Sequence, residues 1–109
     1  MNKTNKTNKY PKQRIYYIAH KIYTFLRENP DHIVIDILKK NVEGMYEPDT
    51  NIISLDPRKA IIPTLIHELI HHWHEDWCET KVLKEEDKIV RSLSVAQMKN
   101  VIKLLGDTL

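Results

Sequence analysis

Cysteine, glycine and long apolar runs are scarce in this sequence. A single cysteine, Cys78, excludes an internal disulfide framework and is typical of a reducing compartment, so we expect a cytoplasmic protein. The longest stretch that looks apolar, residues 15–26, is interrupted by His20, Lys21 and Thr24. A membrane-spanning helix needs about 20 mostly apolar residues, so we expect no membrane segment, and the N-terminus lacks the apolar core of a secretory signal.

Neither sign of charge dominates the chain. Its 17 basic and 15 acidic residues give a formal net charge of +2, which is no strong indication of a nucleic acid or an anionic membrane as partner. Hydrophobic residues make up 41% of the sequence and charged residues 29%, so the composition is that of a globular protein. A chain of 109 residues is long enough for one domain with one core.

The first twelve residues differ in composition from the rest of the chain. Residues 2–9 repeat a Thr-Asn-Lys pattern and contain no apolar side chain. This predicts a flexible basic tail over residues 1–12, followed by a single domain over residues 13–109. The lysines of the tail could contact a polyanion, although such a charge run is more often only solvated.

Hydrophobic periodicity predicts an α+β fold. A helical stripe of apolar residues ends before Pro30, and short β-branched runs then predict three strands, with a hairpin at Pro48. Ser94 followed by Gln97 predicts a capping box at the start of the last helix. We therefore expect a small single domain with a three-stranded sheet and about four helices. The elements are expected at residues 13–28, 33–38, 42–46, 52–55, 60–74, 82–93 and 95–105.

The pattern His-Glu-x-x-His occurs inside the predicted helix at residues 60–74, as His67, Glu68 and His71. The four-residue spacing places both imidazoles on one face, about one turn apart, where their nitrogens can converge on one ion. This predicts a catalytic zinc site in which Glu68 is the general base that accepts a proton from a zinc-bound water. A strand at residues 52–55 lies just upstream, where an extended peptide could add along an exposed sheet edge.

A catalytic zinc needs a third protein ligand and an open fourth position. In one class that ligand is a histidine six residues after the second histidine, but Trp77 stands there, which excludes this class. A straight helix would place Glu79 roughly 12 Å beyond His71, so a bend is required, and His74 to Asp76 permit one. If Asp76 caps the next helix, Glu79 returns toward the metal. Asp76 and His74 are the other candidate ligands, and a capping box between Asp76 and Glu79 is the alternative without a metal.

The chain continues the motif as His67-Glu68-Leu69-Ile70-His71-His72, followed by Asp76-Trp77-Cys78-Glu79 and then Val82. This pattern resembles the minigluzincins, a family of small soluble zinc metallopeptidases with archaeal members, and the likeness covers most of the chain beyond the tail. It implies a gluzincin-type endopeptidase that acts on a peptide or protein substrate. It also implies that zinc is bound by His67, His71 and Glu79, with Glu68 as the general base.

The chain departs from related enzymes at one position, and the resemblance implies one further property. Many zinc peptidases with a glutamate ligand carry an Asp four residues later that orients a histidine ligand; here that residue is Leu83, so the orienting partner is unidentified. The resemblance also implies a latent, zymogen-like form whose cleft is obstructed by a terminal segment. The Lys/Asn-rich N-terminus and the acidic end at Asp107 are the candidates, and a Cys78 thiolate on the zinc is a third route.

Several residues and functions stay open at this level. Tyr46, His72, His74 and Arg91 are all candidates for stabilising the oxyanion of a tetrahedral intermediate, and the sequence does not choose among them. A protease tethered to a polyanion by the basic tail is one alternative. A non-catalytic zinc-binding structural or interaction module is the other, and in such a module loss of the metal would unfold the chain.

Overall fold

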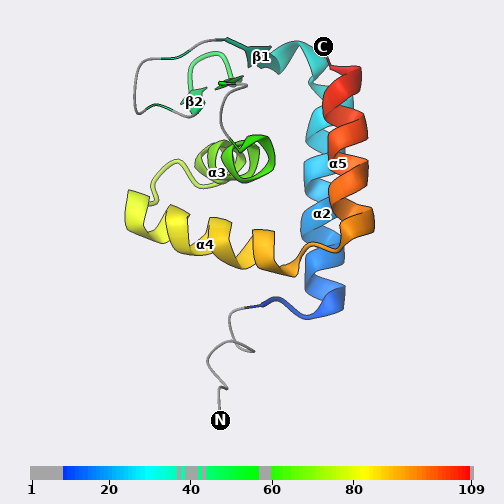
Figure 1. The fold of residues 1–109 in the computed structure, drawn as a ribbon. Helices are drawn as coiled ribbons and strands as arrows, with labels where there is room; N and C mark the ends of the chain where they lie inside the picture. Colours follow the sequence, from blue (N-terminus) through cyan, green and yellow to red (C-terminus); the bar gives the residue numbers. More distant parts are fainter. Residues whose placement is uncertain (1–8, 37, 39–41, 43, 57–59, 109) are drawn as a thin grey trace.

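The computed structural model describes residues 9–36, 38, 42, 44–56 and 60–108 (Figure 1). Within them the chain forms four α-helices, a short 3-10 helix and three strands. The predicted α+β fold, with its three-stranded sheet and about four helices, is confirmed. In chain order the elements are α2 (Lys12–Glu28), η1 (Pro30–His32), β1 (Ile33–Ile35), β2 (Gly44–Glu47), β3 (Ile52–Leu55), α3 (Ile61–Trp73), α4 (Glu79–Ser92) and α5 (Val95–Asp107).

The sheet has the order β1-β3-β2, with β3 in the centre. β1 pairs with β3 in parallel, and β2 pairs with β3 in the predicted antiparallel hairpin. Asn51 has a positive φ of 58° in the hairpin turn, a conformation that asparagine tolerates well. Our expectation that residues 52–55 present an exposed sheet edge is wrong, because both sides of β3 are paired. Among the described strands, β1 and β2 are the outer ones.

Strand β1 is shorter than predicted. It ends at Ile35, after which the Asp36 N–H still donates to the Leu55 carbonyl over 3.0 Å. The Leu38 N–H then donates to Oδ2 of Asp56 over 3.2 Å, so the acceptor at this point is a side-chain oxygen and not a backbone carbonyl of a neighbouring strand. Ile37 lies outside the described residues.

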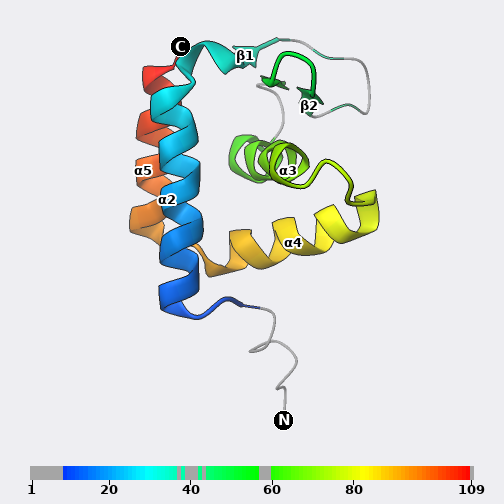
Figure 2. The same ribbon diagram turned by 180° about the vertical axis from the view of Figure 1, so that it is seen from behind.

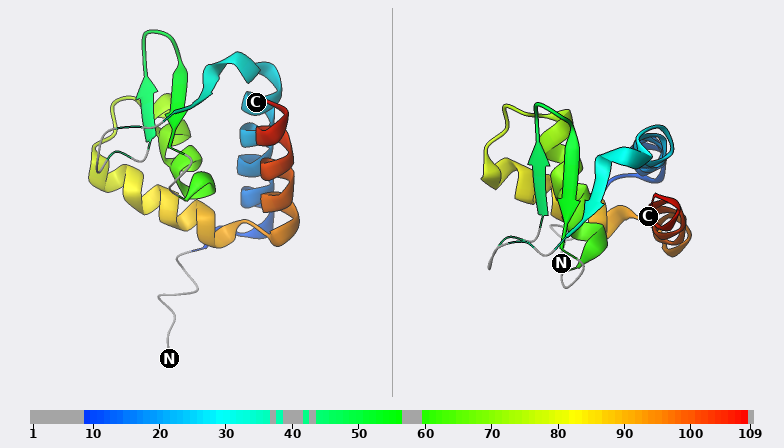
Figure 3. Two further views of the ribbon diagram at one scale, coloured as in Figure 1. Left: turned by 45° about the horizontal axis from the view of Figure 1, so that its top comes forward. Right: turned by 90° about the horizontal axis from the view of Figure 1, so that it is seen from above.

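Helix α3 lies between the sheet and α4, whereas α2 and α5 run side by side as a separate pair (Figures 1 and 2). The β2–β3 hairpin lies over α3, as the views in Figure 3 show. Four α3 side chains have no exposed surface and form the centre of the core, and each such burial contributes about 1.5–3 kcal/mol to folding. These are Leu65, Ile66, Leu69 and Ile70. The packing holds α3 in one orientation, and the motif residues project from the same helix.

The start of α2 is attached to α4. The Tyr10 N–H donates to Oγ of Ser92 over 2.7 Å, its hydroxyl donates to Glu85, and the Lys88 ammonium lies 4.2 Å from the centre of its ring. Of the predicted flexible tail over residues 1–12, residues 1–8 lie outside the described residues. None of the helices formed by the described residues is both long and apolar enough to cross a membrane.

The last helix begins as predicted. Ser94 is its N-cap and accepts from the Gln97 backbone N–H over 3.1 Å, while the Gln97 side chain accepts from the Ser94 N–H over 2.8 Å. This reciprocal pair satisfies two backbone donors that the helix itself leaves free. The expected capping box is therefore confirmed.

Candidate metal centre and its cleft

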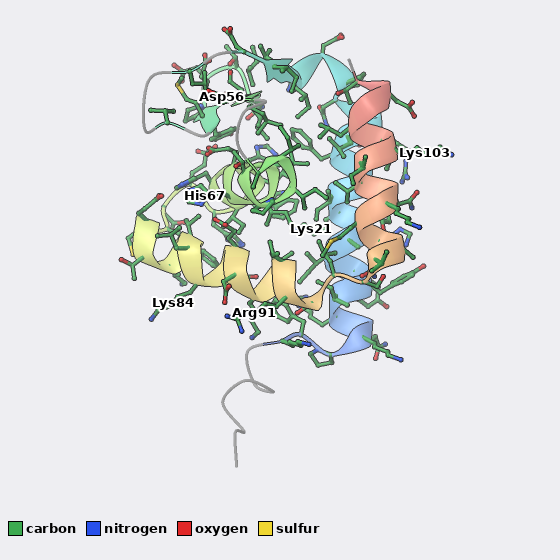
Figure 4. The ribbon with its side chains drawn as sticks, viewed as in Figure 1. Lys21, Asp56, His67, Lys84, Arg91 and Lys103 are labelled. Atoms are coloured by element: carbon green, nitrogen blue, oxygen red, sulfur yellow. The ribbon has the colours of Figure 1, made fainter. Side chains whose placement is uncertain are left out.

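His67 and His71 project from the same face of α3. They lie four residues apart, and their Nε2 atoms are 3.2 Å from each other. The side chains are only 16% and 27% exposed, respectively. His67 lies between α3 and α4 in Figure 4. The helical spacing therefore brings two ring nitrogens to one point, as the motif predicts.

A tight reversal of the chain follows α3. The helix ends at Trp73, the His74 N–H still donates to the Ile70 carbonyl over 2.8 Å, and the Trp77 N–H donates back to the His74 carbonyl over 3.0 Å. The His74 ring stacks on Trp77 with 3.8 Å between ring centroids and 7° between planes. The predicted bend at residues 74–76 is therefore present.

The expectation that Asp76 caps the next helix is wrong. Helix α4 begins at Glu79, its N-cap is Cys78, and the Cys78 side chain makes no capping hydrogen bond. The turn closed between His74 and Trp77 moves the N-cap two residues further along the chain, to Cys78, and leaves Asp76 exposed in the turn. Glu79 is nevertheless in the first turn of α4, as predicted.

The reversal returns Glu79 to the two histidines. Its Oε2 lies 2.9 Å from His67 Nε2, and its Oε1 lies 3.0 Å from His71 Nε2. One ligand atom from each of the three residues lies within 4.8 Å of the others, so this group could hold a metal ion. His74 and Asp76 are not members of this group in the part of the chain that the structure describes. Of the candidate third ligands, only Glu79 is brought to the histidines.

Glu86 is a residue of the candidate site that sequence reasoning missed. Its Oε1 lies 2.7 Å from His67 Nδ1, so it accepts the ring N–H and leaves Nε2 free to bind a metal. Burial lowers the pKa of His67, but the Glu86 hydrogen bond and the charges of Glu79, Glu68 and Glu86 outweigh it and raise the pKa overall. Glu86 stands seven residues after Glu79, two turns along α4, and this spacing was the signal that could have identified it.

Glu68 follows His67 on α3 and lines the same cleft as the triad. The residue is 7% exposed, and its carboxylate accepts a hydrogen bond from the Tyr46 backbone N–H of β2. Burial is the largest cause that raises its pKa to about 7; the charge of His67 opposes it, and those of Glu79 and Glu86 add to it. A carboxyl group with such a pKa can both take up and release a proton near neutral pH.

Gly44 allows β2 to approach this carboxylate. A Cβ atom built on Gly44 would lie 2.6 Å from Cγ2 of Thr64 and 3.1 Å from Cγ of Glu68, closer than side chains normally pack. The glycine is therefore required by close approach and not by backbone conformation. It sets the distance between the edge strand and the α3 face that carries Glu68.

The triad opens into a cleft of about 600 Å³ between β2, α3 and α4. Of the four candidates for the oxyanion, Tyr46 is the one that lines this cleft. The His72 ring packs against Phe25 and Tyr46, and Arg91 pairs with Asp87 on the side of α4 away from α3 (Figure 4). The cleft is lined by Val42, Gly44, Met45, Tyr46, Pro48, Pro63, Thr64, His67, Glu68, His71, Glu75, Glu79, Leu83 and Glu86.

The role of Glu86 can be measured through metal affinity. Glu86→Ala removes the acceptor that holds the His67 ring, so we expect zinc affinity to fall by about 10–100-fold, measured by competition with a chromophoric chelator. Asp87→Asn is the matched control, because this neighbouring carboxylate is exposed and pairs with Arg91. An affinity that stays unchanged in Glu86→Ala would show that Glu86 does not support the site.

The role of Gly44 can be measured through stability. Gly44→Ala forces a methyl group against Thr64 and Glu68, so we expect the free energy of unfolding in a denaturant titration to fall by about 1–3 kcal/mol. Gly106→Ala is the control, since no atom lies within 4 Å of its Cβ position and alanine suits a helix better than glycine. A Gly44→Ala protein as stable as the wild type would contradict the close approach of β2.

The chain matches no family model, no curated protein and no solved structure. The resemblance to the minigluzincins therefore rests on the residues around the motif alone. The function of the centre has to be argued from the donor atoms, the carboxylate beside them and the cleft into which they open.

Proposed function

We propose that this protein is a zinc-dependent metallopeptidase. The observation that carries the proposal is the convergence of His67, His71 and Glu79 beside the buried carboxyl group of Glu68. Two imidazoles and one carboxylate are a ligand set typical of catalytic zinc, which keeps a fourth position open. Glu86 adds the carboxylate partner that metal-binding histidines usually have.

The chemistry of the centre is divided between the ion and the chain. Zinc, when bound, supplies a Lewis acid that polarises a carbonyl group and lowers the pKa of water. Glu68 takes the proton from the attacking water and passes it to the amine that leaves. Burial raises the pKa of Glu68 to about 7, which suits a group that must accept and release a proton in one cycle.

The edge of the sheet favours a peptide as the substrate. β2 is an outer strand of the sheet that the described residues form, and four residues in or next to it line the cleft: Gly44, Met45, Tyr46 and Pro48. An extended peptide that adds to such an edge forms backbone hydrogen bonds whatever its sequence. The same strand contributes the Tyr46 N–H to Glu68, so a peptide on β2 would lie next to the general base.

Glu68→Gln separates the role of the base from the role of the ligands. We expect peptide cleavage to fall by about 10²–10⁴-fold, because general base catalysis contributes that much, while zinc content stays the same. Cleavage is followed with a quenched fluorescent peptide library, and zinc by atomic absorption. Glu47→Gln, on the exposed end of β2 and outside the cleft, is the control. Undiminished cleavage in Glu68→Gln would remove the assignment.

Removal of the metal separates the peptidase from the alternative, a non-catalytic structural zinc module. The ligands project from helices whose other faces are packed in an apolar core, so we expect the chain to stay folded after chelation. Its circular dichroism spectrum should be retained and its melting should remain cooperative, with a lower midpoint because bound metal stabilises by mass action. A structural module predicts instead that chelation unfolds the protein.

A further inference from the structure

The cleft is acidic although the chain as a whole is not. Among the described residues, four carboxylates line it, those of Glu68, Glu75, Glu79 and Glu86, together with two histidines and neither lysine nor arginine. The whole chain has a formal net charge of +2, so this concentration of negative charge is local. A divalent ion at the triad would neutralise two of the four charges when all are ionised.

The basic residues of the described part of the chain do not compensate these carboxylates. In the described part of the chain, the ion pairs of the cleft carboxylates are those of Glu79 and Glu86 with the two histidines. The described ion pair that involves an arginine joins Arg91 to Asp87 and lies outside the cleft. Lys84 and Arg91 lie on the side of α4 that faces away from α3 (Figure 4). The described lining of the cleft therefore has an excess of negative charge that a ligand would meet.

Three of the four carboxylates have a place in the proposed chemistry, and Glu75 does not. Glu68 is the base, Glu79 is a ligand and Glu86 orients His67. Glu75 is exposed, lies four residues after His71, and lines the same cleft from the turn that follows α3. Within the cleft it lies next to Tyr46, whose hydroxyl is 2.9 Å from Oε2 of Glu75.

Tyr46 holds the Glu75 carboxylate in place. The Tyr46 hydroxyl lies 2.9 Å from Oε2 of Glu75, 2.7 Å from Oδ1 of Asn51 and 3.1 Å from Nδ1 of His72. The carboxylate is the stronger of the two oxygen acceptors because it is charged. Burial, and after it the Glu75 hydrogen bond, raises the pKa of Tyr46 to about 12, so the hydroxyl remains a donor. A carboxylate fixed in this way loses little freedom when it binds a cation.

We propose that the cleft selects peptides with a lysine or arginine side chain at the Tyr46 end of β2, and that Glu75 is the residue that determines this specificity. The inference rests on the proposed peptidase function. A long basic side chain on a peptide along the edge of β2 reaches a carboxylate at the rim without displacing the ligands. Tyr46 acts as the positioning residue for that carboxylate.

Binding to the zinc-loaded Glu68→Gln protein tests the proposal without requiring turnover. Three fluorescent alanine-based peptides that differ at one central position, lysine, norleucine or glutamate, are compared by anisotropy. We expect the lysine peptide to bind about two- to fivefold more tightly than the norleucine peptide, with the preference declining as salt increases. Glu75→Gln in this background should abolish the preference, and Glu75→Lys should reverse it toward the glutamate peptide.

Asp76→Asn is the matched control, because Asp76 is exposed in the same turn but does not line the cleft, and it should leave the preference intact. Equal binding of the lysine and norleucine peptides, no measurable binding of the lysine peptide, or a preference that survives Glu75→Gln would each overturn the inference. Glu75 would then be only a hydrogen-bond link between the turn and the hairpin. Cleavage without charge preference by the wild type would leave the peptidase proposal standing and remove this one.

Discussion

The convergence of the three candidate metal ligands depends on the reversal of the chain between Trp73 and Glu79. A helix that continued through these residues would place Glu79 roughly 12 Å from His71 along its axis, and no shared ion could then be bound. The stacked rings of His74 and Trp77, with the hydrogen bond that closes the turn between them, hold the reversal in place. Helix α4 consequently runs back beneath α3 and presents both Glu79 and Glu86 to the histidines.

This arrangement concentrates like charges, which is unfavourable without a cation. Glu68, Glu79 and Glu86 all act on His67 and raise its pKa, and Glu79 and Glu86 both raise the pKa of Glu68. The apolar core on the other side of α3 supplies the stability that such a cluster lacks. A divalent ion relieves the repulsion directly, so the site is organised for a cation before one binds. The same excess of carboxylates extends to the rim at Glu75.

The sequence predicted the features that depend on local spacing. The histidine pair follows from helical periodicity, the capping box of α5 from Ser94 and Gln97, and the bend after α3 from the need to recover a third ligand. The strands were also located, because β-branched runs and the turn at Pro48 are local signals. Glu79 was the leading candidate for the third ligand because a bend at His74 to Asp76 would return it to the histidines, and the resemblance strengthened that choice. Its actual distance to the histidines could not be predicted, since it depends on how the chain reverses.

The features that were missed depend on how separate elements pack. Glu86 contacts His67 because it lies two turns after Glu79, on the face of α4 that packs toward the histidines. The residue that orients a histidine ligand was expected four residues after Glu79, where the chain has Leu83. The central position of β3 was misread because the pairing of β1 with it is parallel and long-range. The contact of Tyr46 with Glu75 joins a hairpin to a turn 29 residues away, and no pattern in the sequence indicates it.

The most direct test of the centre is anomalous diffraction at the zinc edge from crystals of the zinc-loaded full-length chain. We expect one peak bonded to Nε2 of His67, Nε2 of His71 and a carboxylate oxygen of Glu79, at about 2.0–2.2 Å from each. Nδ1 of His67 should remain on Glu86, and one position on the ion should be open to the cleft. A zinc ion held by Cys78, or by residues outside this triad, would contradict this expectation.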